Sequence, residues 1–195
     1  MEISSLFEIE ILTFGFFMII LGIDPGTATT GFGIIKKTDK GKKAVNGFGF
    51  EYLAHGVIKT TTDFSAADRL NKIHIELNKI LKTHQPAIVA VESLFFFKNL
   101  KTALPVSQAR GVILMTLAKK RLPIHEFTPL QMKMIVAGYG RAEKKQVQET
   151  IKRLLALKEI PRPDDAADAL GIAICCALKV TNYIPPGHKK LKKSK

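Results

Sequence analysis

Two patterns of apolar residues alternate along the chain. Short apolar runs that end at a turn signal are typical of strands buried in a sheet, whereas apolar residues three and four positions apart are typical of a helix packed on a core. The run "FMIILGI" at 17–23 shows the first pattern, because it stops at "DPGT". The segment 65–84 shows the second pattern, and Ser65 is a candidate N-cap for its helix.

Read in this way, the chain begins with three strands and continues with helices and strands in alternation. The expected strands cover 18–24, 31–36, 50–60, 87–93 and 123–128. The expected helices cover 65–84, 106–121, 129–137, 143–157 and 165–180. This order predicts an α/β fold in which a three-strand meander and further parallel strands form a mixed sheet with helices on both faces. We expect one domain at 18–182, an N-terminal extension or misassigned start at 1–17, and a basic tail without fixed structure at 183–195.

The end of the first strand raises a question about function. Asp24 follows a buried apolar run, where a carboxylate costs free energy unless it is paired or holds a cation. Pro25 and Gly26 predict a type II turn, with positive φ at Gly26. Asp24 therefore either caps this turn or belongs to a functional site, and the stretch alone leaves both interpretations open.

Three more carboxylates make the functional interpretation stronger. Glu92 lies near the end of the strand expected at 87–93, and Asp165 and Asp168 open an apolar helix with a spacing that puts both on one face. Asp164 fits a helix N-terminus, where an acid favours the helix dipole, but that explanation does not extend to Asp168. Four converging carboxylates would repel one another unless a divalent cation bound between them, and carboxylate oxygens suit Mg²⁺ or Mn²⁺.

The amino-acid composition indicates the kind of binding partner and the cellular compartment. The formal net charge is +13, and removing the five lysines of the tail "GHKKLKKSK" still leaves +8, which favours nucleic acid over an anionic membrane or an acidic protein. The adjacent Cys175 and Cys176 exclude a disulfide framework and a zinc site, and they indicate a reducing compartment. The apolar run at 14–23 is too short to span a bilayer, and no Lys or Arg precedes it, so we expect a cytoplasmic protein with no membrane partner.

Five segments together resemble the RuvC family of Holliday junction resolvases over residues 18–178. They are "IILGIDPGTATTGFGII", "AVESLFFFKN", "SQARGVI", "GYGRAEKKQVQ" and "DDAADALGIAI". The resemblance implies a ribonuclease H-like fold and a homodimer, for which we expect an interface within 108–122. It also implies Mg²⁺-dependent paired nicking of four-way DNA junctions in homologous recombination and DNA repair, and contact with the RuvA–RuvB branch-migration complex. The extension at 1–17 and the lysine-rich tail have no counterpart in this pattern.

The resemblance assigns roles to seven residues. The family's catalytic, metal-binding acids fall on Asp24, Glu92, Asp165 and Asp168, its junction-core aromatic on Phe95, and its basic residues near the cleaved strand on Lys133 and Lys144. Two Mg²⁺ ions, which Mn²⁺ could replace, would activate a water and steady the leaving 3′ oxygen. Three consecutive phenylalanines at 95–97 cannot all face one core, so an exposed one could stack on a base. Lys144 also fits an ordinary solvated helix residue.

Two other functions stay open at this point. A "DPGT" turn after a strand also occurs in actin-like and sugar-kinase ATPases, where it faces a nucleotide phosphate. Those folds need two lobes and a second phosphate loop, for which 195 residues leave little room. A junction-binding protein without catalysis is the second alternative, although such a protein needs no acid cluster in its binding face.

Overall fold

The computed structural model describes residues 17–38, 49–93 and 100–179. Five strands form one mixed sheet in the order β3-β2-β1-β4-β5. They are β1 (Phe17–Asp24), β2 (Thr29–Thr38), β3 (Phe50–Lys59), β4 (Ile88–Glu92) and β5 (Ile124–Phe127). The first three form an antiparallel meander, and β4 and β5 extend the sheet from β1 in parallel. Each expected strand is therefore present, with bounds that differ by one or two residues.

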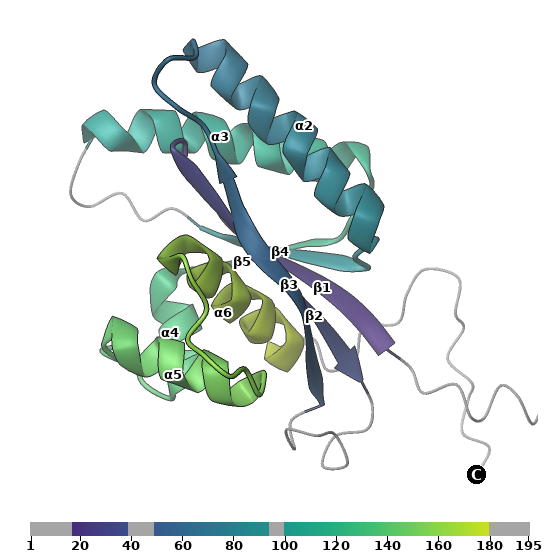
Figure 1. Ribbon diagram of the computed structural model, residues 1–195, viewed down its shortest axis with the longest axis vertical. Helices are drawn as coiled ribbons and strands as arrows, with labels where there is room; N and C mark the ends of the chain where they lie inside the picture. Colours follow the sequence, from purple (N-terminus) through teal and green to yellow (C-terminus); the bar gives the residue numbers. More distant parts are fainter. Residues whose placement is uncertain (1–16, 39–48, 94–99, 180–195) are drawn as a thin grey trace, which may run out of the picture.

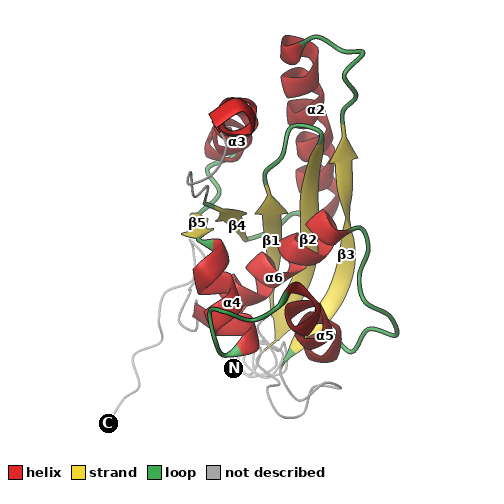
Figure 2. Ribbon diagram, turned by 90° about the vertical axis from the view of Figure 1, so that its left-hand side faces the viewer, coloured by secondary structure: helices red, strands yellow, loops and turns green. Residues whose placement is uncertain are grey.

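Helices cover both faces of the sheet (Figure 1). On one face lie α2 (Ala66–His84) and α3 (Leu100–Lys119), and on the other lie α4 (Pro129–Ala137), α5 (Lys144–Leu154) and α6 (Asp164–Lys179). A hydrophobic core lies on each face of the sheet, and successive side chains of β1 point into opposite cores because strand side chains alternate between faces. Leu21 packs in the core under α2 and α3, whereas Ile20 packs in the core under α6. In Figure 2, which looks onto the sheet so that β1, β2 and β3 stand side by side, α6 crosses the strands and α2 extends beyond their upper ends.

The helices begin where local chemistry favours a start, with one exception. Ser65 caps α2 by accepting a hydrogen bond of 3.1 Å from the backbone N–H of Asp68, as expected. The prediction for α3 was wrong about its start, since the helix begins at Leu100 and contains Pro105. The expected start at 106 left Pro105 outside the helix, whereas the helix tolerates the loss of the one backbone hydrogen bond that a proline removes.

The connection from β1 to β2 differs from the predicted type II turn. Gly26 is not among the residues with positive φ. Its role is steric, because a Cβ at Gly26 would lie 2.1 Å from the carbonyl oxygen of Thr29. Side chains also hold the connection: the hydroxyl of Thr30 donates to the carbonyl of Gly26 at 2.6 Å, and the hydroxyl of Thr60 donates to the carbonyl of Thr27. The absence of a side chain at Gly26 thus allows the backbone of Thr29 to approach closely, next to Asp24.

Glycines also bring α6 against the centre of the sheet. A Cβ at Gly22 would lie 2.0 Å from the carbonyl oxygen of Ala169, and one at Gly33 would lie 2.6 Å from the backbone nitrogen of Leu170. The helix backbone therefore rests on the strand backbones with no side chain between them. This contact fixes the height of α6 above β1 and β2.

The C-terminal half of α6 is mostly apolar and packs in the core. Cys175 and Cys176 are buried there, and burial raises the pKa of each thiol to about 12, so both stay protonated core residues. Lys37 of β2 donates to the carbonyl of Ala177, which satisfies one of the free carbonyls at the helix end. Within the described ranges, no helix combines the length and the apolar character that crossing a membrane requires.

Candidate active site

The four acids expected from the sequence come from three elements that meet at one edge of the sheet. Parallel pairing of Ile23 with Val91 places Asp24 beside Glu92 at the carboxyl ends of β1 and β4. On the other side of Asp24, β2 pairs Gly31 with it, and a Cβ at Gly31 would lie 2.0 Å from the carbonyl oxygen of Asp165. The start of α6 therefore lies against the strand ends that carry the first two acids.

Asp24 and Glu92 form the buried centre of this cluster. Burial raises the pKa of Asp24 to about 9, and its hydrogen bond with Glu92 and the negative charges of Glu92, Asp168 and Asp165 act in the same direction. Burial also raises the pKa of Glu92, with a contribution from Asp168, although the hydrogen bond from Asp24 opposes it. Burial and mutual repulsion therefore disfavour the charged forms of both carboxyl groups, most strongly at Asp24.

Lys144, the first residue of α5, supplies a positive charge to the same cluster. Its Nζ lies 3.1 Å from Oδ2 of Asp164 and 3.4 Å from Oδ2 of Asp168. Burial lowers the pKa of Lys144, but the hydrogen bonds and charges of the two carboxylates outweigh it and raise the pKa overall. Burial raises the pKa of Asp168, and Lys144 counteracts this. The structure therefore brings Lys144 to the acids, while its role near the cleaved strand stays a prediction.

Asp164 takes part in this cluster in a way that the sequence did not indicate. It is the first residue of α6, one position before the expected start at 165, and it also accepts hydrogen bonds from Gln148 at 3.1 Å and from Arg162 at 2.7 Å. Hydrogen bonds from Lys144 and then Gln148 lower the pKa of its carboxyl group. The only sequence signal was the spacing of Lys144 and Gln148, which puts both on one face of α5.

Lys133, another predicted site residue, is not joined to the acids. Lys133 is half-buried on α4, and no hydrogen bond or ion pair of the described residues connects it with the four carboxylates. Phe95 lies outside the described residues. The roles of both stay predictions from the family resemblance.

The acid cluster fits a divalent cation by its donor chemistry. In the described part of the chain, no three His, Cys, Asp or Glu side chains form a ready-made metal cage. The raised pKa of Asp24 and the ammonium of Lys144 instead offset part of the negative charge of the cluster. A hard divalent cation suits oxygen ligands of this kind, and it would replace the proton of Asp24 when it bound.

Comparison with known proteins identifies a family for most of the chain. The sequence model of the crossover junction endodeoxyribonuclease RuvC matches residues 20–176. A relative of that description from Heliobacterium modesticaldum is 52% identical over 164 residues, which are 84% of this chain and 96% of the relative.

Solved structures give the same result. The RuvC structure of Thermus thermophilus has a TM-score of 0.75 and 34% identity, with 83% of this chain and 94% of that chain covered. The same protein in complex with a Holliday junction substrate has a TM-score of 0.74 and 33% identity, with 83% and 93% covered. These matches confirm the predicted ribonuclease H-like fold. On the sequence and the structure together, the chain belongs to the RuvC family of crossover junction endodeoxyribonucleases.

Proposed function

We propose that this protein resolves Holliday junctions by nicking two DNA strands symmetrically about the crossover, through hydrolysis of phosphodiester bonds. The observation that carries the proposal is the convergence of Asp24, Glu92, Asp165 and Asp168 at one sheet edge in a chain that is strongly basic. Family membership supports the substrate, since the Thermus relative has been solved in complex with a Holliday junction. It also disfavours the ATPase alternative that the "DPGT" turn had left open.

The residues of the site divide the chemistry between them. Bound Mg²⁺ or Mn²⁺, two ions per site, would make a water nucleophilic and stabilise the leaving 3′ oxygen. Asp24 and Glu92 would hold the metal ions rigidly, because both residues lie at the ends of buried strands. Asp165 and Asp168 would complete the ligand set from α6. Lys144 would offset charge that develops on the scissile phosphate.

A homodimer is the assembly that we propose for paired nicking. Nicks on two strands of like polarity require two identical sites related by a two-fold axis. The outer ridge of α3 suits such an interface, because Leu104 and Met115 are 69% and 44% exposed and Gln108, Gly111 and Ala118 lie on the same side. A Cβ at Gly111 would meet no atom within 4 Å, so a second copy could approach closely there.

The test is cleavage of a four-way junction of defined arms, labelled in turn on each strand. With Mg²⁺ we expect nicks at symmetric positions on two opposed strands, and with excess EDTA we expect binding without nicks. A linear duplex of the same sequence is the control. Junction binding without cleavage in either Mg²⁺ or Mn²⁺ would contradict the proposal and favour the non-catalytic junction-binding alternative.

A further inference from the structure

Both carboxylate oxygens of Asp164 are engaged by neighbouring side chains. Oδ2 lies 3.1 Å from Nζ of Lys144, whereas Oδ1 accepts from Nε2 of Gln148 at 3.1 Å and from Nη1 of Arg162 at 2.7 Å. Gln148 is only 5% exposed, so its side chain has little freedom to move. The carboxylate is therefore oriented from two sides, and the oxygen that faces Lys144 has a fixed direction.

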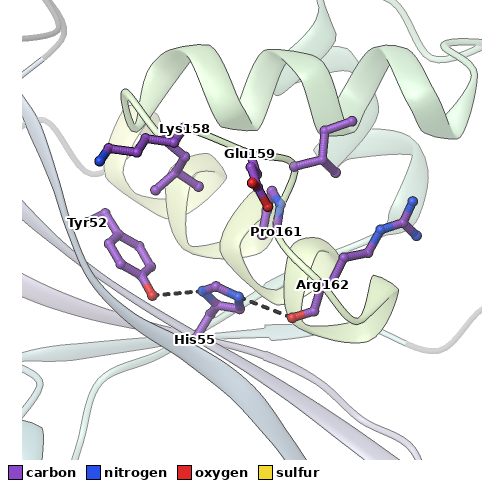
Figure 3. A pocket seen from close by; sticks show the side chains of 8 residues that line it. Tyr52, His55, Lys158, Glu159, Pro161 and Arg162 are labelled. Atoms are coloured by element: carbon purple, nitrogen blue, oxygen red, sulfur yellow. Dashed lines mark hydrogen bonds between the residues drawn. The ribbon is translucent and has the colours of Figure 1, made fainter.

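Arg162 is in turn attached to the sheet through its main chain. The segment 157–162 and β3 enclose an open cavity of about 350 Å³, in which the ring of His55 lies between Tyr52 and Arg162 (Figure 3). Nε2 of His55 lies 3.2 Å from the carbonyl oxygen of Arg162 and therefore donates to it, while Nδ1 lies 2.8 Å from the hydroxyl of Tyr52 and accepts from it. These polar groups satisfy one another and tie the main chain of the segment to β3, next to the start of α6, whereas the guanidinium of Arg162 that reaches Asp164 is largely exposed.

The position of the Lys144 side chain depends on a neighbouring carboxylate more than the positions of the four acids do. The strand ends and the close contact of α6 with the sheet fix the four acids, but the side chain of Lys144 is 53% exposed and has four rotatable bonds. Its Nζ is closer to Asp164, at 3.1 Å, than to Asp168, at 3.4 Å. The anchoring carboxylate thus contributes at least as much as Asp168 to where the ammonium lies.

We propose that Asp164 is a positioning residue of this active site, which holds the ammonium of Lys144 beside Asp168 so that it faces the scissile phosphate. The inference rests on the role proposed above for Lys144 in cleavage. It assigns Asp164 no contact with DNA or metal, and it replaces the expectation that this residue merely favours a helix N-terminus.

A double-mutant cycle tests this role directly. The variants are Asp164→Ala, Lys144→Ala and the double variant, assayed by single-turnover cleavage of a labelled four-way junction in saturating Mg²⁺. We expect Asp164→Ala to slow cleavage about 10- to 100-fold, in line with the cost of misplacing a catalytic group, while the Kd for the junction in metal-free buffer stays unchanged. In the Lys144→Ala background, the same change should cause no further loss, because the group that it positions is gone.

Asp164→Asn separates positioning from helix capping. Asn caps a helix nearly as well as Asp and still accepts from Gln148 and Arg162, but it lacks the charge that holds the ammonium. We therefore expect Asp164→Asn to cleave as slowly as Asp164→Ala, with thermal unfolding close to wild type. Glu149→Gln and Lys145→Ala, exposed changes on the same helix, are matched controls that should cleave normally.

The outcomes distinguish this inference from the proposed function. If Lys144→Ala slows cleavage but Asp164→Asn cleaves at the wild-type rate, or if the losses of Asp164→Ala and Lys144→Ala simply multiply, Asp164 does not position Lys144. If Lys144→Ala itself cleaves normally, the proposed role of Lys144 is wrong and the inference is overturned with it.

Discussion

Asp24→Asn is the change that tests the charge balance of the site most directly. In the folded protein the pKa of Asp24 is about 9, against 3.8 for an unperturbed Asp, because burial and the neighbouring acids disfavour its charged form. Folding at pH 7 without metal therefore takes up a proton. At about 1.4 kcal/mol per pH unit between 3.8 and 7, this uptake costs up to ~4 kcal/mol of stability. The amide of Asn carries no charge at any pH and can still donate to Glu92.

The change of folding stability with pH follows from the raised pKa of Asp24. The contribution of Asp24 to stability is complete below pH 3.8, where the unfolded chain is also protonated, and it is lost progressively as the pH rises toward about 9. In EDTA at pH 7, we therefore expect Asp24→Asn to be more stable than wild type by at least ~1 and at most ~4 kcal/mol, and this advantage should shrink at pH 5. Urea unfolding at pH 5, 7 and 8 measures both effects.

The same variant should lose nicking activity by orders of magnitude, since it lacks one charged ligand of the acid cluster. Its binding to the junction in metal-free buffer at pH 7 should persist unchanged, because Asp24 is already protonated there and the replacement removes no charge that repels phosphate. Asp63→Asn, on an exposed loop, is the matched control and should change neither property. Equal stability of Asp24→Asn and wild type at all three pH values, or near-normal nicking in Mg²⁺, would refute the reasoning and return Asp24 to a turn-capping role.

Three further changes probe other parts of the molecule. Gly31→Ala should destabilise the protein by about 1–3 kcal/mol in urea unfolding, because its Cβ would overlap a backbone oxygen of α6, whereas Gly171→Ala meets only side-chain ends and should cost less. Met115→Arg should yield monomers in sedimentation and lose paired nicking, whereas Ile75→Arg, at an equally exposed position on α2, should stay dimeric. Phe95→Ala should slow cleavage with almost unchanged thermal stability if Phe95 stacks on a base; a loss of about 3–5 kcal/mol would instead identify it as core.

The sequence predicted the acids better than the groups around them. Asp24 and Glu92 were recognisable because each lies at the carboxyl end of an apolar strand, and Asp168 was recognisable because a capping acid is not needed one turn into an apolar helix. Local patterns of this kind are visible in one dimension. The arrangement of α5 against α6 is not, so the ion pair of Asp164 with Lys144, twenty positions away, could be seen only in the structure.

Backbone detail was the other limit of the sequence. Pro-Gly at 25–26 has the composition of a type II turn, but Gly26 does not have positive φ. The glycine is needed because the carbonyl oxygen of Thr29 lies where a Cβ would be. The helix expected at 106–121 instead begins at Leu100 and continues through Pro105. The expectations for 1–17, Phe95 and the basic tail concern residues wholly or almost wholly outside the described ranges and stay predictions.

The contact of α6 with glycines of β1 and β2 has a consequence for how the protein tolerates change. Because backbone rests on backbone there, the spacing between the acids of the strands and those of the helix does not depend on how large side chains interlock. The core beneath α2 and α3, on the opposite face, can therefore accept many volume-conserving substitutions without moving the acids. Sequence drift or thermostabilising design can proceed on that face, whereas a single added methyl group at Gly22, Gly31 or Gly33 would shift the site itself.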